Sequence, residues 1–392
     1  MTVGIICEFD PLHRGHAHLL AQARAMGASA VVCAMSGSFT QRGSFAAVSK
    51  TARAEMALRC GADLVLELPV LWAMSPAERF ADGGVALLTR TGVADTLLFG
   101  SECGDLPALQ TAAAALDSPA FTEALRARQE NGVTFAAARQ QALASLPGVD
   151  ASLLEKPNNT LAVEYLRAIA RQRSRLVPLT IPRTGADHDG PPEAGTASAS
   201  HLRALLSRGA AEDACAFMPP AAADILRREV RSGHIADPAL CERAILSRLR
   251  TMSEADWQPY DHGGEGLYHR LFRAAQTGAS LEEVLTAAKT KRYPLSRLRR
   301  MIMAAWLALP PDVPAQPPYL RVLAANAAGR ALLRQMRGSG APVLTKPADA
   351  PALGREAAAL LALESRCTDL RALACPDPGR PGADTRAVPL ML

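Results

Sequence analysis

The chain has 392 residues, of which 49% are hydrophobic, 43 are lysine or arginine and 38 are aspartate or glutamate. This length exceeds a typical single compact core, so we expect two domains, or one domain with a large appendage. There is no run of about 18 apolar residues and no signal-peptide pattern, which argues against membrane and secreted proteins and predicts a cytoplasmic one. The net charge of +5 is compatible with a polyanionic partner but does not identify one.

The eight cysteines form no C-x-x-C pair and do not stand at zinc-ligand spacing beside histidines. We therefore expect neither a disulfide framework nor a protein-bound metal. Cys7 and Cys33 lie inside apolar runs, where cysteine usually acts as a small buried hydrophobe.

Short apolar runs recur about every thirty residues in the first hundred, and each is followed by a polar turn and a helix-like stretch. The runs are residues 3–7, 30–34, 64–68 and 96–99, with a fifth candidate strand at 176–181. This spacing is typical of βαβ units and predicts an α/β fold with a Rossmann-like parallel sheet covered on both faces. Ligands of such sheets gather at the carboxyl ends of the strands.

The later part of the chain has a different pattern. Residues 184–200 are rich in Gly, Pro, Ala and Asp and predict a mobile loop. From His201 onward the apolar residues repeat mainly at helical spacing, and the segment after Cys375 is rich in Pro and Gly. We therefore expect a nucleotide-binding domain at 1–200, a helical region at 201–375 and a flexible tail at 376–392.

The first predicted strand leads into the sequence EFDPLHRGH, residues 8–16, and then into a helix-like stretch. His13 and His16 therefore stand at a helix N-terminus, where N–H groups and the helix dipole favour a phosphate. Gly15 lacks a Cβ, so a nucleotide can approach the backbone closely. Two imidazoles at an α-phosphate can donate hydrogen bonds to the charge that grows as a nucleophile attacks. The alternative is that either histidine only caps a turn, but the strand, turn and helix context favours phosphate binding.

Further segments follow in order: AMSGSFTQRGSFAAVSKTARAEMALRCGADLVLELP, FGSE, PNNTLAVEYLRAI, TKRYPLSRLRRMI and RVLAANAAGRALL. With EFDPLHRGH they resemble the successive signatures of the bacterial tRNA(Met) cytidine acetate ligase family, within the HIGH-type nucleotidyltransferase superfamily. The resemblance extends from residue 3 to about residue 346. It implies an enzyme that makes acetyl-adenylate from ATP and acetate and transfers the acetyl group to the wobble cytidine of elongator tRNA(Met), giving N4-acetylcytidine. The implied partners are ATP with Mg²⁺, acetate and tRNA, with no bound organic cofactor.

Carried over by position, the resemblance implies ATP contacts in the first loop, after the fourth strand, in the Pro-Asn-Asn turn and at the end of the fifth strand. Gly100 stands where a strand ends close to a purine or ribose, and Arg183 stands where a guanidinium can reach the triphosphate. The asparagines have N-capping as an equally common role. The implied ATP contacts are Ile6, Cys7, Glu8, Phe9, Asp10, Pro11, Leu12, His13, Arg14, Gly15, His16, Ala17, His18, Leu19, Gly100, Asn158, Asn159 and Arg183.

Two other groups are candidate phosphate or substrate contacts. Ser198, Ser200 and Arg203 resemble the turn that holds outer phosphates in this superfamily, although a plain helix cap explains the serines equally well. The loop with Gln41 and Arg42, and Lys50 after it, faces the same predicted sheet edge and could contact acetate or RNA. The alternative for this loop is a solvated connection.

The densest basic cluster comprises Lys289, Lys291, Arg292, Arg297 and Arg300, with the aromatic Tyr293 among them. Basic residues beside an aromatic ring suit RNA, because the ring can stack on a base. A charged, solvated helix face is the alternative, and only the resemblance favours tRNA.

The chain departs from the family pattern at several positions. Asp10 replaces the usual asparagine, Leu12 replaces phenylalanine, and Ser44 and Phe45 replace an acidic-proline pair. The histidines and glycine of the first loop remain, so we expect ATP use to persist while acyl-group choice and RNA specificity are less secure. Two other functions compete: a small-molecule adenylyltransferase, and an RNA-binding protein that binds nucleotide without turnover.

Overall fold

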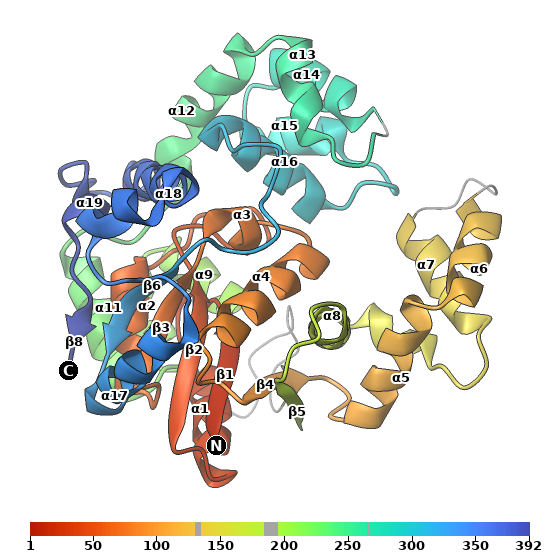
Figure 1. Cartoon of the computed structure of the whole chain (residues 1–392). Coiled ribbons are helices and arrows are strands. Elements are labelled where there is room, and N and C mark those ends of the chain that lie inside the picture. The colour runs from red at the N-terminus through yellow and green to blue at the C-terminus, as the bar shows by residue number, and fades with distance from the viewer. Residues whose placement is uncertain (130–134, 184–194, 265) are drawn as a thin grey trace.

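The computed structural model describes residues 1–129, 135–183, 195–264 and 266–392. Five parallel strands lie side by side in the order β5-β4-β1-β2-β3 (Figure 1). They are β1 (Thr2–Cys7), β2 (Ala30–Ser36), β3 (Leu64–Leu68), β4 (Thr96–Ser101) and β5 (Val177–Pro182). The predicted Rossmann-like parallel sheet and its five strands are confirmed. The predicted mobile loop falls largely on residues 184–194, which lie outside the described residues.

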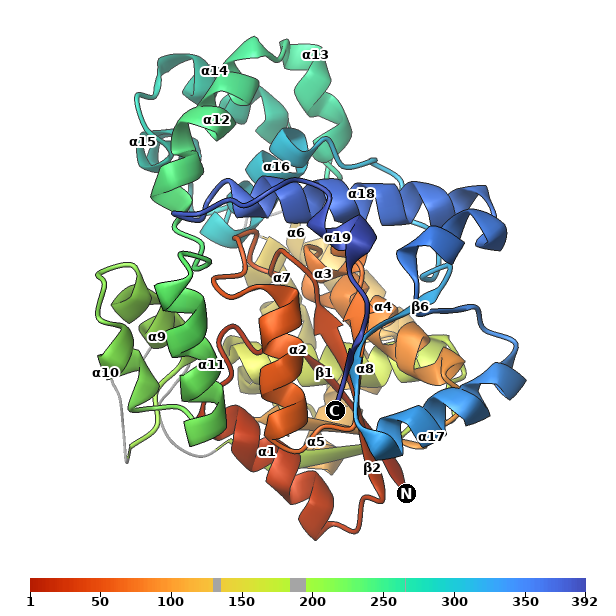
Figure 2. The same ribbon diagram turned by 90° about the vertical axis from the view of Figure 1, so that its left-hand side faces the viewer.

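Helices cover both faces of this sheet because its strands are apolar on both sides. One face packs against α1 (Arg14–Ala25), α2 (Lys50–Arg59), α9 (Ala199–Leu206), α10 (Ala211–Cys215) and α11 (Pro220–Arg231). The other packs against α3 (Val70–Ala73), α4 (Ala77–Arg90) and α8 (Pro157–Arg171). Figure 2 shows α9, α10 and α11 grouped beside α2.

Two helical groups extend away from the sheet (Figure 1). The larger one contains α12 (Pro238–Thr251), α13 (Glu254–Trp257), α14 (Leu267–Thr277), α15 (Leu281–Ala288) and α16 (Leu295–Leu307). The smaller one contains α5 (Leu106–Leu116), α6 (Pro119–Gln129) and α7 (Phe135–Ala144). The predicted helical character after residue 201 is confirmed for the larger group. Among the described residues no helix is long and apolar enough to cross a membrane.

An aromatic contact joins the larger helical group to the sheet. Trp306 of α16 packs edge-on against Phe45 at a ring distance of 5.6 Å, and Phe45 lies 5.3 Å from Phe39 in the loop after β2. The backbone of this loop also lies directly against α16. A Cβ added to Gly43 would stand only 2.5 Å from the backbone nitrogen of Arg300. The loop after β2 is therefore one place where the two parts of the protein meet.

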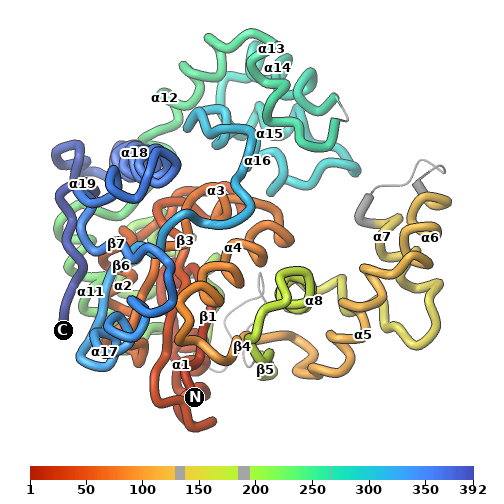
Figure 3. The backbone as a smooth tube through the Cα atoms, viewed as in Figure 1, coloured from red at the N-terminus to blue at the C-terminus, as the bar shows by residue number. Residues whose placement is uncertain are grey.

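The C-terminal part returns to the sheet, which the sequence patterns did not indicate. β6 (Leu320–Ala325) pairs antiparallel with β3, and both β7 (Val343–Leu344) and β8 (Leu390–Met391) pair with β6. Figure 3 shows the β6 and β7 segments beside β3. α17 (Ala327–Met336), α18 (Arg355–Ala372) and α19 (Ala383–Arg386) complete this part. The sheet thus draws strands from residues beyond the expected domain boundary at 200. The segment 376–392, expected to be a flexible tail, contributes β8 and α19.

A buried ionic cluster holds that C-terminal segment in place. Lys50 contacts Glu67 at 2.6 Å and Asp384 at 2.9 Å, while Arg321 contacts Glu67 at 2.9 Å and Asp384 at 2.7 Å. Each of the four side chains is at most 4% exposed. Burial alone would raise the pKa of Asp384, but Lys50 and Arg321 outweigh burial and hold that pKa well below its usual value.

Replacing Asp384 with alanine should strongly destabilise the fold, because Lys50 and Arg321 would stay buried with Glu67 as their remaining partner in the cluster. Removing one partner of a buried ion pair typically lowers the free energy of unfolding by about 3 to 5 kcal/mol. Urea unfolding followed by circular dichroism measures this loss. The exposed Asp377→Ala in the same segment is the control, and a comparable, small loss in both variants would contradict the anchoring role.

Candidate active site

The loop from β1 into α1 is organised by its two histidines. His13 is the N-cap of α1, and its Nδ1 accepts a hydrogen bond from the Gly15 N–H at 3.1 Å. The His16 Nδ1 accepts one from the His13 N–H at 3.3 Å. The rings stack at 3.7 Å with an interplanar angle of 24°. Gly15 allows this packing, because an added Cβ would lie 3.0 Å from the His13 ring.

These contacts set the tautomer of each ring. An imidazole nitrogen that accepts a hydrogen bond carries no proton, so each neutral ring bears its hydrogen on Nε2. Burial, followed by the nearby charges of His13, Arg183 and Arg203, lowers the pKa of His16 well below its usual value. At neutral pH His16 is therefore a neutral Nε2–H donor.

The sequence predicts that backbone N–H groups at the start of α1 contact a phosphate, but the structure shows these groups bonded within the protein. The N–H groups of Gly15, His16 and Ala17 donate to His13, and that of Arg14 donates to the Phe217 carbonyl at 3.0 Å. In this conformation the first-turn amides are engaged within the protein. At this turn the side chains of the lining residues, rather than the first-turn amides, face the pocket as candidate ligand contacts.

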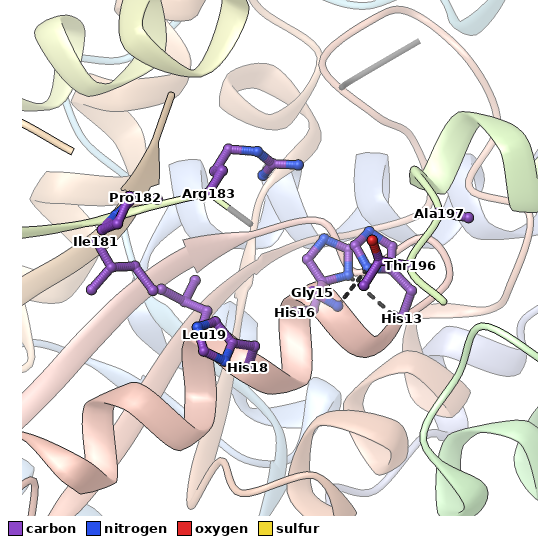
Figure 4. Close-up of a pocket in the computed structure, with 11 residues that line it drawn as sticks. His13, Gly15, His16, His18, Leu19, Ile181, Pro182, Arg183, Thr196 and Ala197 are labelled. Atoms are coloured by element: carbon purple, nitrogen blue, oxygen red, sulfur yellow. Dashed lines mark hydrogen bonds between the residues drawn. The ribbon is translucent and has the colours of Figure 1, made fainter. Parts of the chain in front are cut away.

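A pocket opens beside the two rings, at the carboxyl ends of β1, β4 and β5 (Figure 4). It encloses about 530 Å³ of space, a volume that includes open solvent at its mouth. Figure 4 shows the guanidinium of Arg183 on one side of the His13 and His16 rings and Thr196 on the other. The lining residues are His13, Gly15, His16, His18, Leu19, Gly100, Ile181, Pro182, Arg183, Thr196 and Ala197.

Seven of the candidate ATP contacts meet at this pocket: His13, Gly15, His16, His18, Leu19, Gly100 and Arg183. Gly100 lies where an added Cβ would stand 3.2 Å from the Arg183 side chain, so a larger residue there would crowd the guanidinium. The other residues of the first loop surround the pocket without lining it. Ile6 and Cys7 belong to the cores on the two faces of the sheet, and Phe9 and Leu12 are also buried.

Two buried groups connect this loop to the loop after β2. The Asp10 carboxylate accepts the N–H groups of Ala47 and Val48 at 3.0 and 3.1 Å. The fully buried Arg53 guanidinium donates to main-chain carbonyls, among them that of Glu8 at 2.6 Å and that of Ser36 at 3.0 Å. Asp10, which replaces the asparagine usual at this position in the family, therefore binds backbone N–H groups of the loop after β2.

The asparagines of the Pro-Asn-Asn turn lie away from the pocket lining. The Glu102 carboxylate accepts the backbone N–H of Asn158 at 3.1 Å and that of Asn159 at 2.6 Å. The Asn159 side chain accepts the Cys103 N–H at 3.1 Å. This arrangement fastens the start of α8 to the end of β4, next to Gly100, so it positions the pocket wall.

The remaining candidate substrate contacts also lie outside the lining. Lys50 is buried in the ionic cluster, and Ser198 caps α9 by accepting the His201 N–H at 3.2 Å. Arg203 donates to the Asp10 carbonyl at 2.7 Å and to the Ser200 hydroxyl at 3.1 Å. Gln41 and Arg42 are half-buried in the loop beneath α16.

The basic cluster near α16 divides into two parts. Lys289, Lys291 and Arg292 are exposed. Arg297 pairs with Asp261 at 3.1 Å, and Arg300 donates to the Gln41 carbonyl at 3.2 Å. Tyr293 is only 5% exposed and packs against the Arg292 and Arg297 guanidinium groups, so its ring is not presented to a base.

Sequence reasoning missed several residues of the site. Thr196 and Ala197 line the pocket just before the Ser198 cap, and Ile181 and Pro182 line it just before Arg183. Only their positions in the sequence, next to the candidate residues Ser198 and Arg183, could have indicated that they line the pocket. Arg53 and Glu102 act through main-chain groups brought together by the fold, for which the sequence carried no local signal. The described residues contain no cluster of His, Cys, Asp or Glu able to hold a metal ion.

The chain is similar to known proteins over nearly its whole length. Residues 1–382 match the HIGH Nucleotidyl Transferase family. A tRNA(Met) cytidine acetate ligase of Acetivibrio thermocellus is 34% identical, with 96% of each chain covered, and one of Syntrophomonas wolfei is 35% identical, with 99% of each covered. The crystal structure of apo Thermotoga maritima TmcAL matches with a TM-score of 0.94, at 28% identity, over 100% of this chain and 99% of that one. The same protein bound with α-thio ATP matches with a TM-score of 0.92.

The lowered pKa of His16 predicts that its ring stays neutral in mildly acidic solution. An unperturbed imidazole would be about three-quarters protonated at pH 6. We expect the NMR signals of the His16 ring, assigned with a His16→Gln variant, to remain unchanged between pH 8 and pH 6. A titration midpoint at or above the ordinary value would contradict the burial and charge argument.

Proposed function

The chain belongs to the tRNA(Met) cytidine acetate ligase family, and we propose that its ATP binds with the α-phosphate against His13 and His16. Membership makes the chain an ATP-using ligase that acetylates a cytidine of tRNA(Met) with acetate. The observation that supports the placement is the stacked pair of Nε2–H imidazoles at the pocket, with Arg183 beside them. The ATP contacts among the loop residues, Gly100, Asn158, Asn159 and Arg183 belong to this proposal.

The first step joins acetate to the α-phosphorus. An acetate oxygen forms the new bond to phosphorus, the bond to the bridging oxygen breaks, and pyrophosphate leaves. Acetate is already ionised at neutral pH, so this step needs no general base. It needs positioning and neutralised phosphate charge, which the two imidazole donors and Arg183 supply, with MgATP as the substrate form.

The second step transfers the acetyl group to the wobble cytidine, giving N4-acetylcytidine and AMP. We propose direct attack of the cytosine amine on acetyl-adenylate, with no acyl-enzyme. Cys7, at the end of β1, is a poor nucleophile because burial and the neighbouring Cys33 raise its pKa well above its usual value. The base must leave its stack to reach the anhydride, which suits the single-stranded wobble position of tRNA.

The helical group carries the proposed tRNA contacts. Lys289, Lys291 and Arg292 are exposed at the end of α15 and before α16, and α16 packs on the loop after β2. A tRNA held there would lie on the side of the protein that adjoins the nucleotide loop. Arg297 and Arg300, which have partners within the protein, support this surface. Because the substrate is tRNA, we place the enzyme in the cytoplasm.

The competing functions have less support. A small-molecule adenylyltransferase offers no account of full-length similarity to tRNA ligases, which covers 96% or more of both chains in two relatives. A nucleotide-binding protein without turnover offers no account of the preserved pair of donor histidines.

His16→Ala should lower acetate-dependent ATP–pyrophosphate exchange by about 100-fold or more, because one preorganised transition-state donor is lost. The exchange of radiolabel from pyrophosphate into ATP measures this step without tRNA. His269→Ala, on the exposed side of α14, is the matched control and should retain activity. Exchange near the wild-type rate in His16→Ala would remove the central claim.

Replacing Lys289, Lys291 and Arg292 together with alanine should weaken tRNA binding and leave ATP binding intact. Each lost phosphate contact should make the dependence of log affinity on log salt shallower by about 0.7 to 0.9. Filter binding over a salt series and calorimetry with ATP provide the measurements. A triple replacement of the exposed Arg334, Arg337 and Lys346 near α17 controls for net charge. If tRNA affinity falls equally in both variants, these residues are not a specific surface.

A further inference from the structure

Glu8 occupies a distinctive place at the end of β1. Its carboxylate is half-buried, and Oε1 accepts the Gln41 N–H at 2.7 Å. No other hydrogen bond to this carboxylate occurs among the residues that the structure describes. One oxygen of a fixed carboxylate is therefore left to accept from a ligand.

On one side Glu8 adjoins the nucleotide loop. The next residue, Phe9, places its ring 5.0 Å from the His16 ring. Arg203, which donates to the Asp10 carbonyl at 2.7 Å, is close enough to influence the pKa values of both Glu8 and His16. Glu8 does not line the pocket itself, but it adjoins the histidine loop through Phe9 and shares the charge of Arg203 with His16.

On the other side Glu8 adjoins the helical group through a single residue, Gln41. The Gln41 N–H donates to Glu8, while the Gln41 carbonyl accepts from Arg300 of α16 at 3.2 Å. Gly43, two residues later, lies against the Arg300 backbone. Glu8 therefore stands between the proposed acetyl-adenylate and the helix that adjoins the proposed tRNA surface.

The second chemical step needs a proton acceptor. The cytosine N4 forms a bond to the acetyl carbon, the bond from that carbon to the phosphate oxygen breaks, and AMP departs with its electron pair. The nitrogen must also lose one proton to become a neutral amide. The first step has no such requirement, because acetate attacks as an anion.

Other groups near the loop are poorly suited to take that proton. His13 and His16 already use Nδ1 as an acceptor and carry hydrogen on Nε2. Both oxygens of Asp10 accept backbone N–H groups, and so do both oxygens of Glu102. Resting on the function proposed above, we propose that Glu8 is the general base that accepts the N4 proton during acetyl transfer.

The surroundings of Glu8 tune it for this role. Burial raises its pKa, while the Gln41 hydrogen bond and the Arg203 charge oppose the rise. A carboxylate of raised pKa is a stronger base than an ordinary glutamate. The charged and titratable groups around it are Cys7 and Asp10 from β1 and its loop, Arg53 from α2, Tyr165 from α8 and Arg203 from α9.

The test uses Glu8→Gln in the full-length protein, since glutamine can still accept the Gln41 N–H but is not a base. Single-turnover acetyl transfer from labelled acetate to tRNA should fall by about 100-fold or more, the usual effect of losing a general base. Acetate-dependent ATP–pyrophosphate exchange should fall far less. Glu8→Asp should recover part of the transfer rate.

The pH profile separates a chemical role from a structural one. Wild-type transfer should slow as the pH falls through the raised pKa of Glu8, and Glu8→Gln should lose this limb. Asp82→Asn, a carboxylate-to-amide change on α4 at a residue paired with Arg171, is the matched control. Transfer by Glu8→Gln at the wild-type rate, or an equal loss in exchange and transfer, would overturn the role of Glu8. A wild-type protein without acetate-dependent exchange would instead overturn the proposed function.

Discussion

The site depends on a charged group that never meets substrate. Arg53 is fully buried and donates to the carbonyls of Glu8, Ser36, Gly37 and Val48. A guanidinium has five donors and no acceptor, so a buried one is tolerated only where several acceptors surround it. Three of those acceptors, Glu8, Ser36 and Gly37, lie at or just after the ends of β1 and β2. Arg53 thereby fixes the loop after β1 relative to the loop after β2, and with it the distance between the histidine pair and α16.

The sequence predicted the parts of this arrangement that are local. Five apolar runs at regular spacing identified the parallel strands, because strands buried on both faces must be apolar throughout. The histidine loop was identifiable because its residues are contiguous and open a helix. Gly100 and Arg183 were carried over from the family resemblance to positions at strand ends, and both line the pocket.

The features that could not be predicted from the sequence depend on partners outside the local pattern. Lys50 was a candidate substrate contact because it begins a helix near the sheet edge, but its charge is neutralised by Asp384, 334 residues away. β6 reads as one apolar run in a helical region, and only its antiparallel pairing with β3 makes it a strand. Tyr293 seemed suited to a base, but Arg292 and Arg297 cover its ring. In each case the deciding partner lies outside the local pattern.

The antiparallel position of β6 has a consequence for how the protein is made. β3 is complete after 68 residues, yet the strand that covers its edge begins at Leu320, so most of the chain must be synthesised before the edge is protected. Until then β3 presents unpaired N–H and C=O groups, which can pair with another chain. Asp384, eight residues before the last residue, completes the neutralisation of Lys50 and Arg321. The nucleotide-binding half therefore reaches its final form only after Asp384 has left the ribosome, and chains that end before this residue are the ones most exposed to aggregation and proteolysis.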